Sequence, residues 1–370
     1  MRFRVPAIVG GAVGLVSAAV AAGVVRERRE VHRERARIDP KSAALFGALP
    51  IDRESTLRTD DGVALHVEEV GPAGAPLTIL FVHGFALNLG AFHFQRLALT
   101  ETFGEKVRMV FYDQRSHGRS LRSPSMGCTI SQLGRDLYGV IDAVAPTGPI
   151  ILVGHSMGGM ALMAFADQYP ALFASKNGRP DREARICSVL MINTSSGNLR
   201  TVTLGLPNVL ARLRGPVLPV VLRRAVKNAD LVEKTRALGK DLAWAVTKRL
   251  SFGSEDVDPA VVAYATNMIA ATRVEVVADF YPTLIEHDGH LGLMNLAGCE
   301  VVIIGAERDA LTPIEHSEAI GLALPDAKLI VAPQAGHILM LENPELVNEA
   351  LIELAASALA AAKPRRRVRR

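Results

Sequence analysis

The chain has 370 residues, of which 49% are hydrophobic and 22% charged, so it holds enough apolar material for one large core or for a core with an inserted subdomain. Its net charge is only +4 and aromatic residues make up 5%, which argues against a nucleic-acid-binding protein because the basic clusters lack interleaved stacking side chains. The three cysteines, Cys128, Cys187 and Cys299, are widely spaced and odd in number, which argues against a disulfide framework or a cysteine-based metal site.

The first predicted element is an apolar run at residues 6–25, which contains no ionisable side chain. It is just long enough to cross a hydrocarbon core of roughly 30 Å. We therefore expect residues 1–41 to form a membrane anchor and a basic linker. Residues 19–21, Ala-Val-Ala, resemble the cleavage site of an export signal, so a secreted protein is the alternative.

Basic residues gather directly after the apolar run. They outnumber Arg2 and Arg4 before the run, so the positive-inside rule predicts that the following domain lies on the cytoplasmic face of the cell membrane; an inverted signal anchor is the alternative. The arginines concerned are Arg26, Arg28, Arg29, Arg33, Arg35 and Arg37.

A folded domain begins near Ser55 with a predicted hairpin that turns at residues 60–62. Short apolar runs rich in Val and Ile follow it, separated by segments long enough for helices. This pattern predicts an α/β fold with an eight-stranded, mostly parallel sheet that carries helices on both faces. The runs are LTILFVHG, VRMVFYD, PIILVGH, ICSVLMIN, EVVIIGA and AKLIVAP.

The stretch ILVGHSMGGMAL at residues 151–162 places Ser156 where a strand turns into a helix. Gly154 and Gly158 complete the G-x-S-x-G pattern of a nucleophile elbow. The plainer interpretation is a glycine-rich turn with an incidental serine. A serine hydroxyl is a weak nucleophile without a base, so the nucleophile hypothesis requires a histidine and an acid elsewhere in the chain.

Those partners are found at the ends of later strands, where Glu307, Asp309 and His337 follow Ser156 in the chain. The order serine, acid, histidine is that of the α/β-hydrolase fold. Over approximately residues 55–362 the sequence resembles the α/β-hydrolase superfamily. The motifs that carry this resemblance are HGF, DQRSHGRS, GHSMGG, GAERDALTP and AGHILMLENP.

The resemblance implies a role for each of these residues. Ser156 is the expected nucleophile, His337 the general base and then acid, and Asp309 the group that orients the imidazole. Glu307 is the rival acid, although it is equally well explained as a surface charge. Serine rather than aspartate at position 156 argues against epoxide opening and dehalogenation.

The family geometry also suggests the donors that stabilise the developing oxyanion. These are the backbone N–H groups of Phe85 and Met157, whose side chains are also candidates to line an acyl pocket. His83 and His155 are interpreted as structural histidines rather than bases.

The resemblance implies a cap inserted into the core, and residues 197–289 have the composition of several helices. The core would then comprise residues 42–196 and 290–362, followed by an Arg-rich tail at residues 363–370. The first half of the cap is both basic and apolar, as suits an anionic membrane face that admits acyl chains. An ordinary solvated cationic face is the alternative.

Together these features predict a membrane-associated serine hydrolase that cleaves carboxylic esters with lipid-like or medium acyl groups through an acyl-enzyme. Its expected partners are a small-molecule ester and membrane lipids, without nucleic acid, metal or cofactor. Thioester cleavage, carbon–carbon bond hydrolysis, amide cleavage and cofactor-free perhydrolysis of the haloperoxidase type use the same triad and stay open. A non-catalytic ligand-binding protein is a further alternative, which a complete triad disfavours.

Overall fold

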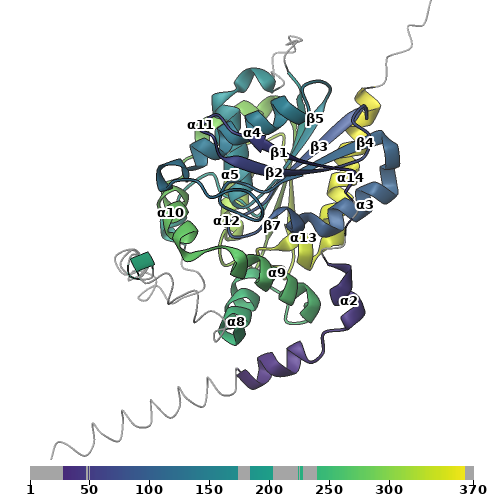
Figure 1. Ribbon diagram of the computed structural model, residues 1–370. Helices are drawn as coiled ribbons and strands as arrows, with labels where there is room; N and C mark the ends of the chain where they lie inside the picture. Colours follow the sequence, from purple (N-terminus) through teal and green to yellow (C-terminus); the bar gives the residue numbers. More distant parts are fainter. Residues whose placement is uncertain are drawn as a thin grey trace, which may run out of the picture.

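The computed structural model describes residues 28–46, 49, 51–173, 184–202, 224, 226–227 and 240–362 (Figure 1). The expected membrane anchor at residues 6–25, the cleavage-site pattern at 19–21 and the Arg-rich tail at 363–370 lie outside the described residues. Most of the basic first half of the expected cap lies outside them as well.

A single eight-stranded sheet forms the centre of the domain, in the order β1-β2-β4-β3-β5-β6-β7-β8. Strand β2 is antiparallel to both of its neighbours, and the strands from β4 to β8 run parallel. The predicted fold class, with its mostly parallel eight-stranded sheet, is confirmed. The strands are β1 Arg53–Arg58, β2 Ala64–Val70, β3 Leu77–Val82, β4 Val107–Tyr112, β5 Ile150–His155, β6 Ile186–Ile192, β7 Glu300–Ala306 and β8 Lys328–Ala332.

The central strands β3, β4 and β5 are buried along their whole length, which explains why they are mostly apolar in sequence. Alternate side chains enter two separate cores. Ile79 and Phe81 join the core on one face of the sheet, whereas Leu80 and Val82 join the core on the other. Helices must therefore cover both faces.

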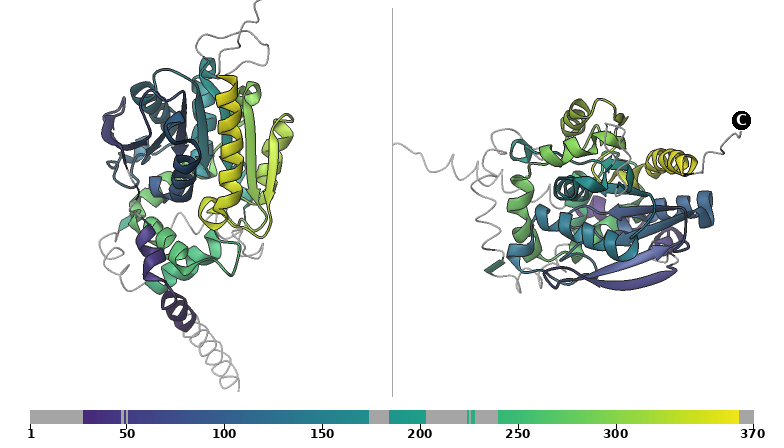
Figure 2. Two further views of the ribbon diagram at one scale, coloured as in Figure 1. Left: turned by 90° about the vertical axis from the view of Figure 1, so that its right-hand side faces the viewer. Right: turned by 90° about the horizontal axis from the view of Figure 1, so that it is seen from above.

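The longest C-terminal helix, α14, packs with α3 against one face of the sheet, as the left view of Figure 2 shows for α14. Helices α4, α5 and α12 contribute to the core on the opposite face. Their bounds are α3 His93–Phe103, α4 Ile130–Val144, α5 Met157–Gln168, α12 Ile314–Ala323 and α14 Pro344–Ala361. This arrangement leaves the carboxyl ends of the parallel strands free for a site.

The segment between β6 and β7 supplies helices α8, α9 and α10; in Figure 1, α8 and α9 lie below the sheet and α10 lies higher, at the left side. Asp258 caps α9 by accepting a hydrogen bond from the Ala260 N–H at 2.8 Å, and Pro259 occupies the first helical position. The cap boundaries at residues 197 and 289 stay predictions. The remaining helices are α2 Pro40–Leu45, α8 Lys240–Ser251, α9 Pro259–Ala271, α10 Val274–Ile285, α11 His290–Asn295 and α13 Leu339–Glu342.

Within the part of the chain that the structure describes, no single helix combines the length and apolar character needed to span a membrane. Helices α9 and α10 meet that requirement only when taken together, and they are bent by 90° relative to each other.

Candidate active site

Ser156 lies at a sharp turn between β5 and α5, with φ of 51° and ψ of −119°. Positive φ is uncommon for residues other than glycine, so the turn holds Ser156 in a strained conformation. Its glycine neighbours make the turn possible. A Cβ atom on Gly158 would lie 2.0 Å from the Val82 carbonyl oxygen, and one on Gly154 would lie 2.8 Å from the Gly159 nitrogen. The G-x-S-x-G spacing therefore reflects close backbone packing at the elbow.

The three residues predicted as a triad come together at the carboxyl ends of the parallel strands. The Nε2 atom of His337 lies 2.9 Å from the Ser156 Oγ, and its Nδ1 atom lies 2.7 Å from the Asp309 Oδ2. With Nδ1–H donating to the carboxylate, Nε2 is free to accept the serine proton. This arrangement can perform general-base activation of a serine nucleophile.

Asp309 is held as a buried acceptor. Its Oδ1 accepts the backbone N–H groups of Leu311 at 2.7 Å and Thr312 at 2.9 Å. The Thr312 hydroxyl lies 2.8 Å from Oδ2. Burial opposes ionisation, but the contact with His337 and these backbone donors outweigh it and lower the pKa of Asp309 below its ordinary value. The carboxylate therefore stays charged opposite the imidazole.

Glu307 does not take part in this arrangement. Its side chain is exposed, and its Oε2 accepts the Gln334 N–H at 3.1 Å. The structure thus pairs His337 with Asp309 and leaves Glu307 on the surface of the same loop.

Asn193 and His155 hold the main chain at His337. The Asn193 side-chain amide donates to the carbonyl oxygens of Gly336 at 2.8 Å and His337 at 2.9 Å. The Nε2 atom of His155 lies 2.8 Å from the His337 carbonyl oxygen. Burial lowers the pKa of His155 to about 3, so its ring is neutral and supports the loop rather than serving as a base.

Sequence reasoning missed two of the supporting residues, Asn193 and Thr312. Asn193 is the last residue of the run ICSVLMIN, and Thr312 lies in the motif GAERDALTP. The signal was their position, because polar residues at the carboxyl ends of neighbouring parallel strands converge on the same edge.

The expected oxyanion donors lie beside Ser156. Met157 begins α5 directly after Ser156, and a Cβ atom on Gly84, the residue before Phe85, would lie 3.2 Å from the Ser156 Cβ. Neither the Met157 N–H nor the Phe85 N–H donates a hydrogen bond to another described residue. Both donors are thus available to an oxygen bound next to Ser156.

A cavity of about 310 Å³ opens onto Ser156 and His337, and we call it the Ser156 cavity. None of the described residues that line it is an aspartate, glutamate, lysine or arginine. The Phe85 side chain lines it, as expected, but Met157 is fully buried and does not; Met160 lines it instead. Its apolar residues are Phe85, Ala86, Leu87, Met160, Leu199, Val202, Val246, Leu250, Ile269, Leu284, Ile285, Leu311 and Ile338.

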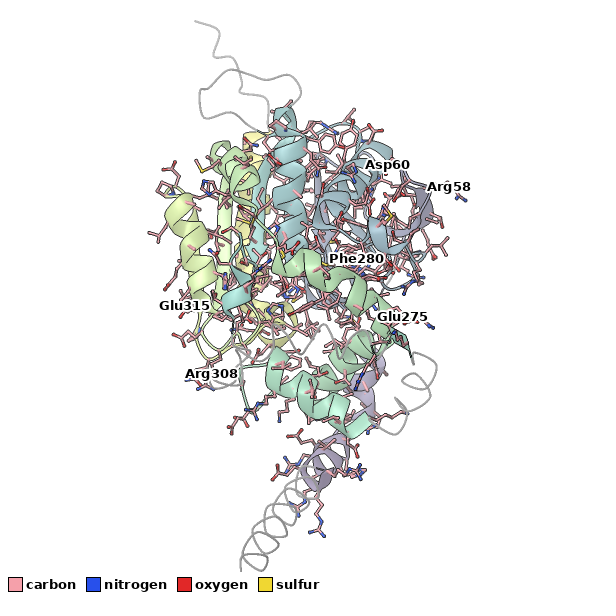
Figure 3. All side chains as sticks on the ribbon, turned by 90° about the vertical axis from the view of Figure 1, so that its left-hand side faces the viewer. Arg58, Asp60, Glu275, Phe280, Arg308 and Glu315 are labelled. Carbon is pink, nitrogen blue, oxygen red and sulfur yellow. The ribbon has the colours of Figure 1, made fainter. Side chains whose placement is uncertain are left out.

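Helix α10 forms one wall of the Ser156 cavity through Tyr281, Leu284 and Ile285. Phe280, which Figure 3 labels on this helix, anchors it to the core. Its ring is fully buried and lies 6.1 Å from the ring of Phe85. A larger hollow of about 780 Å³ lies between α10 and the ends of α4 and α5, but it contains no member of the triad.

Comparison with known proteins gives one family. The model described as "Alpha/beta hydrolase family" matches residues 79–350. A protein from Caulobacter sp. (strain K31) that carries the name "Putative carbamate hydrolase RutD" is 24% identical over 299 residues, which cover 80% of this chain and 96% of the relative.

Solved structures share the fold. A thermophilic esterase from Thermogutta terrifontis matches with a TM-score of 0.61 and 24% identity, covering 83% of this chain and 99% of its own. The enol-lactonase from Burkholderia xenovorans LB400 matches with a TM-score of 0.61 and 22% identity, covering 82% of this chain and 100% of its own. At these identities the likeness establishes the fold alone.

Proposed function

The chain belongs to the α/β-hydrolase family, and on that premise we propose that it is a serine hydrolase that cleaves carboxylic esters with uncharged, apolar acyl groups. The observation that carries the proposal is the contact between His337 Nε2 and Ser156 Oγ at 2.9 Å, with Asp309 behind the histidine and an apolar cavity in front of the serine.

The proposed reaction begins when the Ser156 Oγ attacks the ester carbonyl carbon and His337 Nε2 takes the hydroxyl proton. The carbonyl π electrons move onto the oxygen, which accepts hydrogen bonds from the Phe85 and Met157 N–H groups. Asp309 stabilises the imidazolium that has formed. The intermediate then collapses, the alkoxide leaves with the proton from His337, and an acyl-serine ester is left. Water activated by His337 hydrolyses this ester and restores Ser156.

The lining of the Ser156 cavity supports an apolar acyl group. A charged group placed there would lose its hydration without meeting a side chain of opposite charge, which is costly. Each buried methylene of an alkyl chain would instead gain about 0.8 kcal/mol. Esters of medium-chain acids should therefore be better substrates than esters of dicarboxylic or amino acids.

A fluorophosphonate tests the nucleophile. We expect it to label Ser156 alone, as located by mass spectrometry, and we expect Ser156→Ala to abolish both labelling and ester turnover while the thermal unfolding temperature is retained. Ser125→Ala, which alters an exposed serine outside the Ser156 cavity, should behave as the wild type does. Labelling at another serine, or full turnover in Ser156→Ala, would refute the proposal.

A substrate series tests the acyl group and the bond that is cleaved. Acetate, octanoate and succinate esters of one alcohol should rank octanoate first and succinate last. A matched carbamate and thioester should be included, because a relative carries the name carbamate hydrolase and the same triad serves thioesters. Faster turnover of the carbamate than of the ester would identify the protein as a carbamate hydrolase rather than a carboxylic ester hydrolase.

We also propose attachment to the cell membrane through residues 6–25, with the domain on the cytoplasmic face. The support is the absence of ionisable side chains in that run and the arginines that follow it. The full chain should stay with membranes through alkaline and high-salt washes. A mature protein that begins near Ala22 and is recovered from the medium would show instead that the segment is a cleaved signal.

A further inference from the structure

The described N-terminal residues pack against the cap. Residues 28–35 are helical, lie before the family-matched residues 79–350, and lie against α8 (Figure 1). Val31 on this segment is 4% exposed and Trp244 on α8 is 3% exposed, and both belong to the same apolar core. We call residues 28–35 the N-terminal helical segment.

Glu34 makes the central polar contact between the two helices. Its Oε2 accepts a hydrogen bond from the Trp244 indole N–H at 3.0 Å, and its Oε1 accepts one from the Lys248 ammonium at 2.5 Å. Burial opposes ionisation of Glu34, but the two donors outweigh burial and lower its pKa. One charged acceptor therefore serves two donors on successive turns of α8.

A second contact lies one turn earlier on α8. Asp241 pairs with Arg35 at 3.2 Å and faces His32 at 3.4 Å, and the Arg35 guanidinium lies 6.0 Å from the centre of the Trp244 ring. These exposed pairs contribute little singly. Together with Glu34 they restrict the rotation of the N-terminal helical segment on α8.

A different face of α8 lines the Ser156 cavity. Val246, Thr247, Leu250 and Ser251 all belong to its lining. At the end of the helix, the Ile338 N–H, which follows His337, donates to the Ser251 carbonyl oxygen at 2.9 Å. Helix α8 thus contacts both the N-terminal helical segment and the Ser156 cavity.

We propose that the N-terminal helical segment is part of the substrate-binding architecture, and that Glu34 is a positioning residue that sets the distance between α8 and the nucleophile. The inference rests on the proposed ester-hydrolase function, and it adds a specificity role for residues outside the family-matched region.

Glu34 would act on the cavity through the position of α8. A helix of 12 residues, such as α8, has little stability of its own, so its position depends on the surfaces that it contacts. Without the Glu34 carboxylate, the indole N–H of Trp244 loses its acceptor, which is unfavourable, so we expect the ring and α8 to shift. Because α8 forms part of the lining of the Ser156 cavity, we expect a long acyl group to contact it and a short one not to. The effect should therefore grow with chain length.

The test uses the full chain with Glu34→Ala, Glu34→Gln and the control Arg33→Ala, which alters an exposed side chain on the same segment. Trp244 is the single tryptophan, so acrylamide quenching of its fluorescence reports the contact directly. Steady-state kinetics with acetate and octanoate esters of one alcohol report how well the Ser156 cavity binds a short and a long acyl group.

For Glu34→Ala we expect stronger quenching and a KM for the octanoate ester that rises about threefold to tenfold, the range of one lost hydrogen bond of ordinary strength. The kinetic constants for the acetate ester should not change. Glu34→Gln keeps an acceptor for the indole and should restore most of the octanoate KM, and Arg33→Ala should match the wild type.

Two results would overturn the inference: stronger quenching with an unchanged octanoate KM, or an equal fall in turnover of both esters. If the wild-type chain shows no Ser156-dependent turnover, the proposed function is refuted, and with it the proposed role of the N-terminal helical segment in substrate binding. The quenching result would still show separately whether Glu34 holds Trp244.

Discussion

Single residues in the site show how local strain and local hydrogen bonding are combined. Ser156 is held at φ of 51°, and Asn193, which supports the His337 loop, is held at φ of 44°. Positive φ is unfavourable for serine and persists because the surrounding packing fixes it, whereas asparagine adopts positive φ more readily than most residues. The same packing leaves Ser156 only 8% exposed, so its hydroxyl is reached through the Ser156 cavity rather than from open solvent.

The pairing of His337 with Asp309 rather than Glu307 leads to a prediction. Asp309→Asn keeps the shape of the side chain but removes the charge that stabilises the imidazolium and selects its tautomer, so turnover should fall by a large factor, roughly 10⁴ in the best-studied triad. Glu307→Gln is the matched control, since that carboxylate is exposed and bonds to Gln334. Initial rates with an octanoate ester measure both. A larger loss in Glu307→Gln would transfer the role to that residue.

At the scale of elements, the end of α8, the His337 loop and α13 are joined by one carboxylate. The Oε1 of Glu342 accepts the N–H groups of Gly253 at 2.8 Å and Ser254 at 2.7 Å, and its Oε2 accepts the Gly336 N–H at 2.7 Å. The glycines permit this approach, because a Cβ atom on Gly336 would lie 2.5 Å from the Gly253 nitrogen. The end of α8 and the loop that carries His337 are therefore positioned together.

The variant Glu342→Gln tests the hydrogen bonds by which Glu342 connects the end of α8 to the His337 loop. Glutamine offers one oxygen, which suits Gly253 and Ser254, but its amide would point N–H groups at the Gly336 N–H. We expect a loss of stability of about 1–3 kcal/mol, the cost of one buried donor without a partner. Urea denaturation measures it, and Glu345→Gln, on an exposed side chain three residues later, is the control. Equal stability of the two variants would show that Glu342 does not join the elements.

For the whole molecule, several histidines are buried in neutral form. Burial lowers the pKa of His83 to about 3 and the pKa values of His93, His117 and His287 to about 4. In the unfolded chain these rings titrate near their ordinary value of about 6.5. Unfolding therefore takes up protons below that pH, so this contribution to stability is fully present above about pH 6.5 and is lost as the pH falls toward the folded values.

Acidification should destabilise the domain because these rings take up protons on unfolding. Each such histidine can add up to about 1.4 kcal/mol per pH unit to the loss. We expect the free energy of unfolding, measured by urea denaturation of the full chain, to decrease from pH 7.5 to pH 5 with an unchanged dependence on urea concentration. A flat profile over this range would contradict the neutral burial of these rings. His93→Phe, which removes one of them, should make the profile less steep.

The sequence by itself determined the sheet and the elbow. Strand periodicity, continuous apolar runs and glycines flanking a serine are local properties, because the side chains of one strand or turn meet the same environment over a few consecutive residues. The hairpin at residues 60–62 was predictable for the same reason, and Gly62 there has φ of 89°. The order of Ser156, Asp309 and His337 added the family resemblance.

Only the tertiary structure decided which side chains touch. Glu307 and Asp309 are two residues apart on one loop, and the residues alone left both open; the N–H groups of Leu311 and Thr312 turn Asp309 toward His337. The contact of Glu34 with Trp244 joins residues 210 positions apart. Such contacts depend on how the strands align and on how the cap helices pack against the rest of the domain. No local pattern encodes them, because their energy arises only when distant surfaces are brought together.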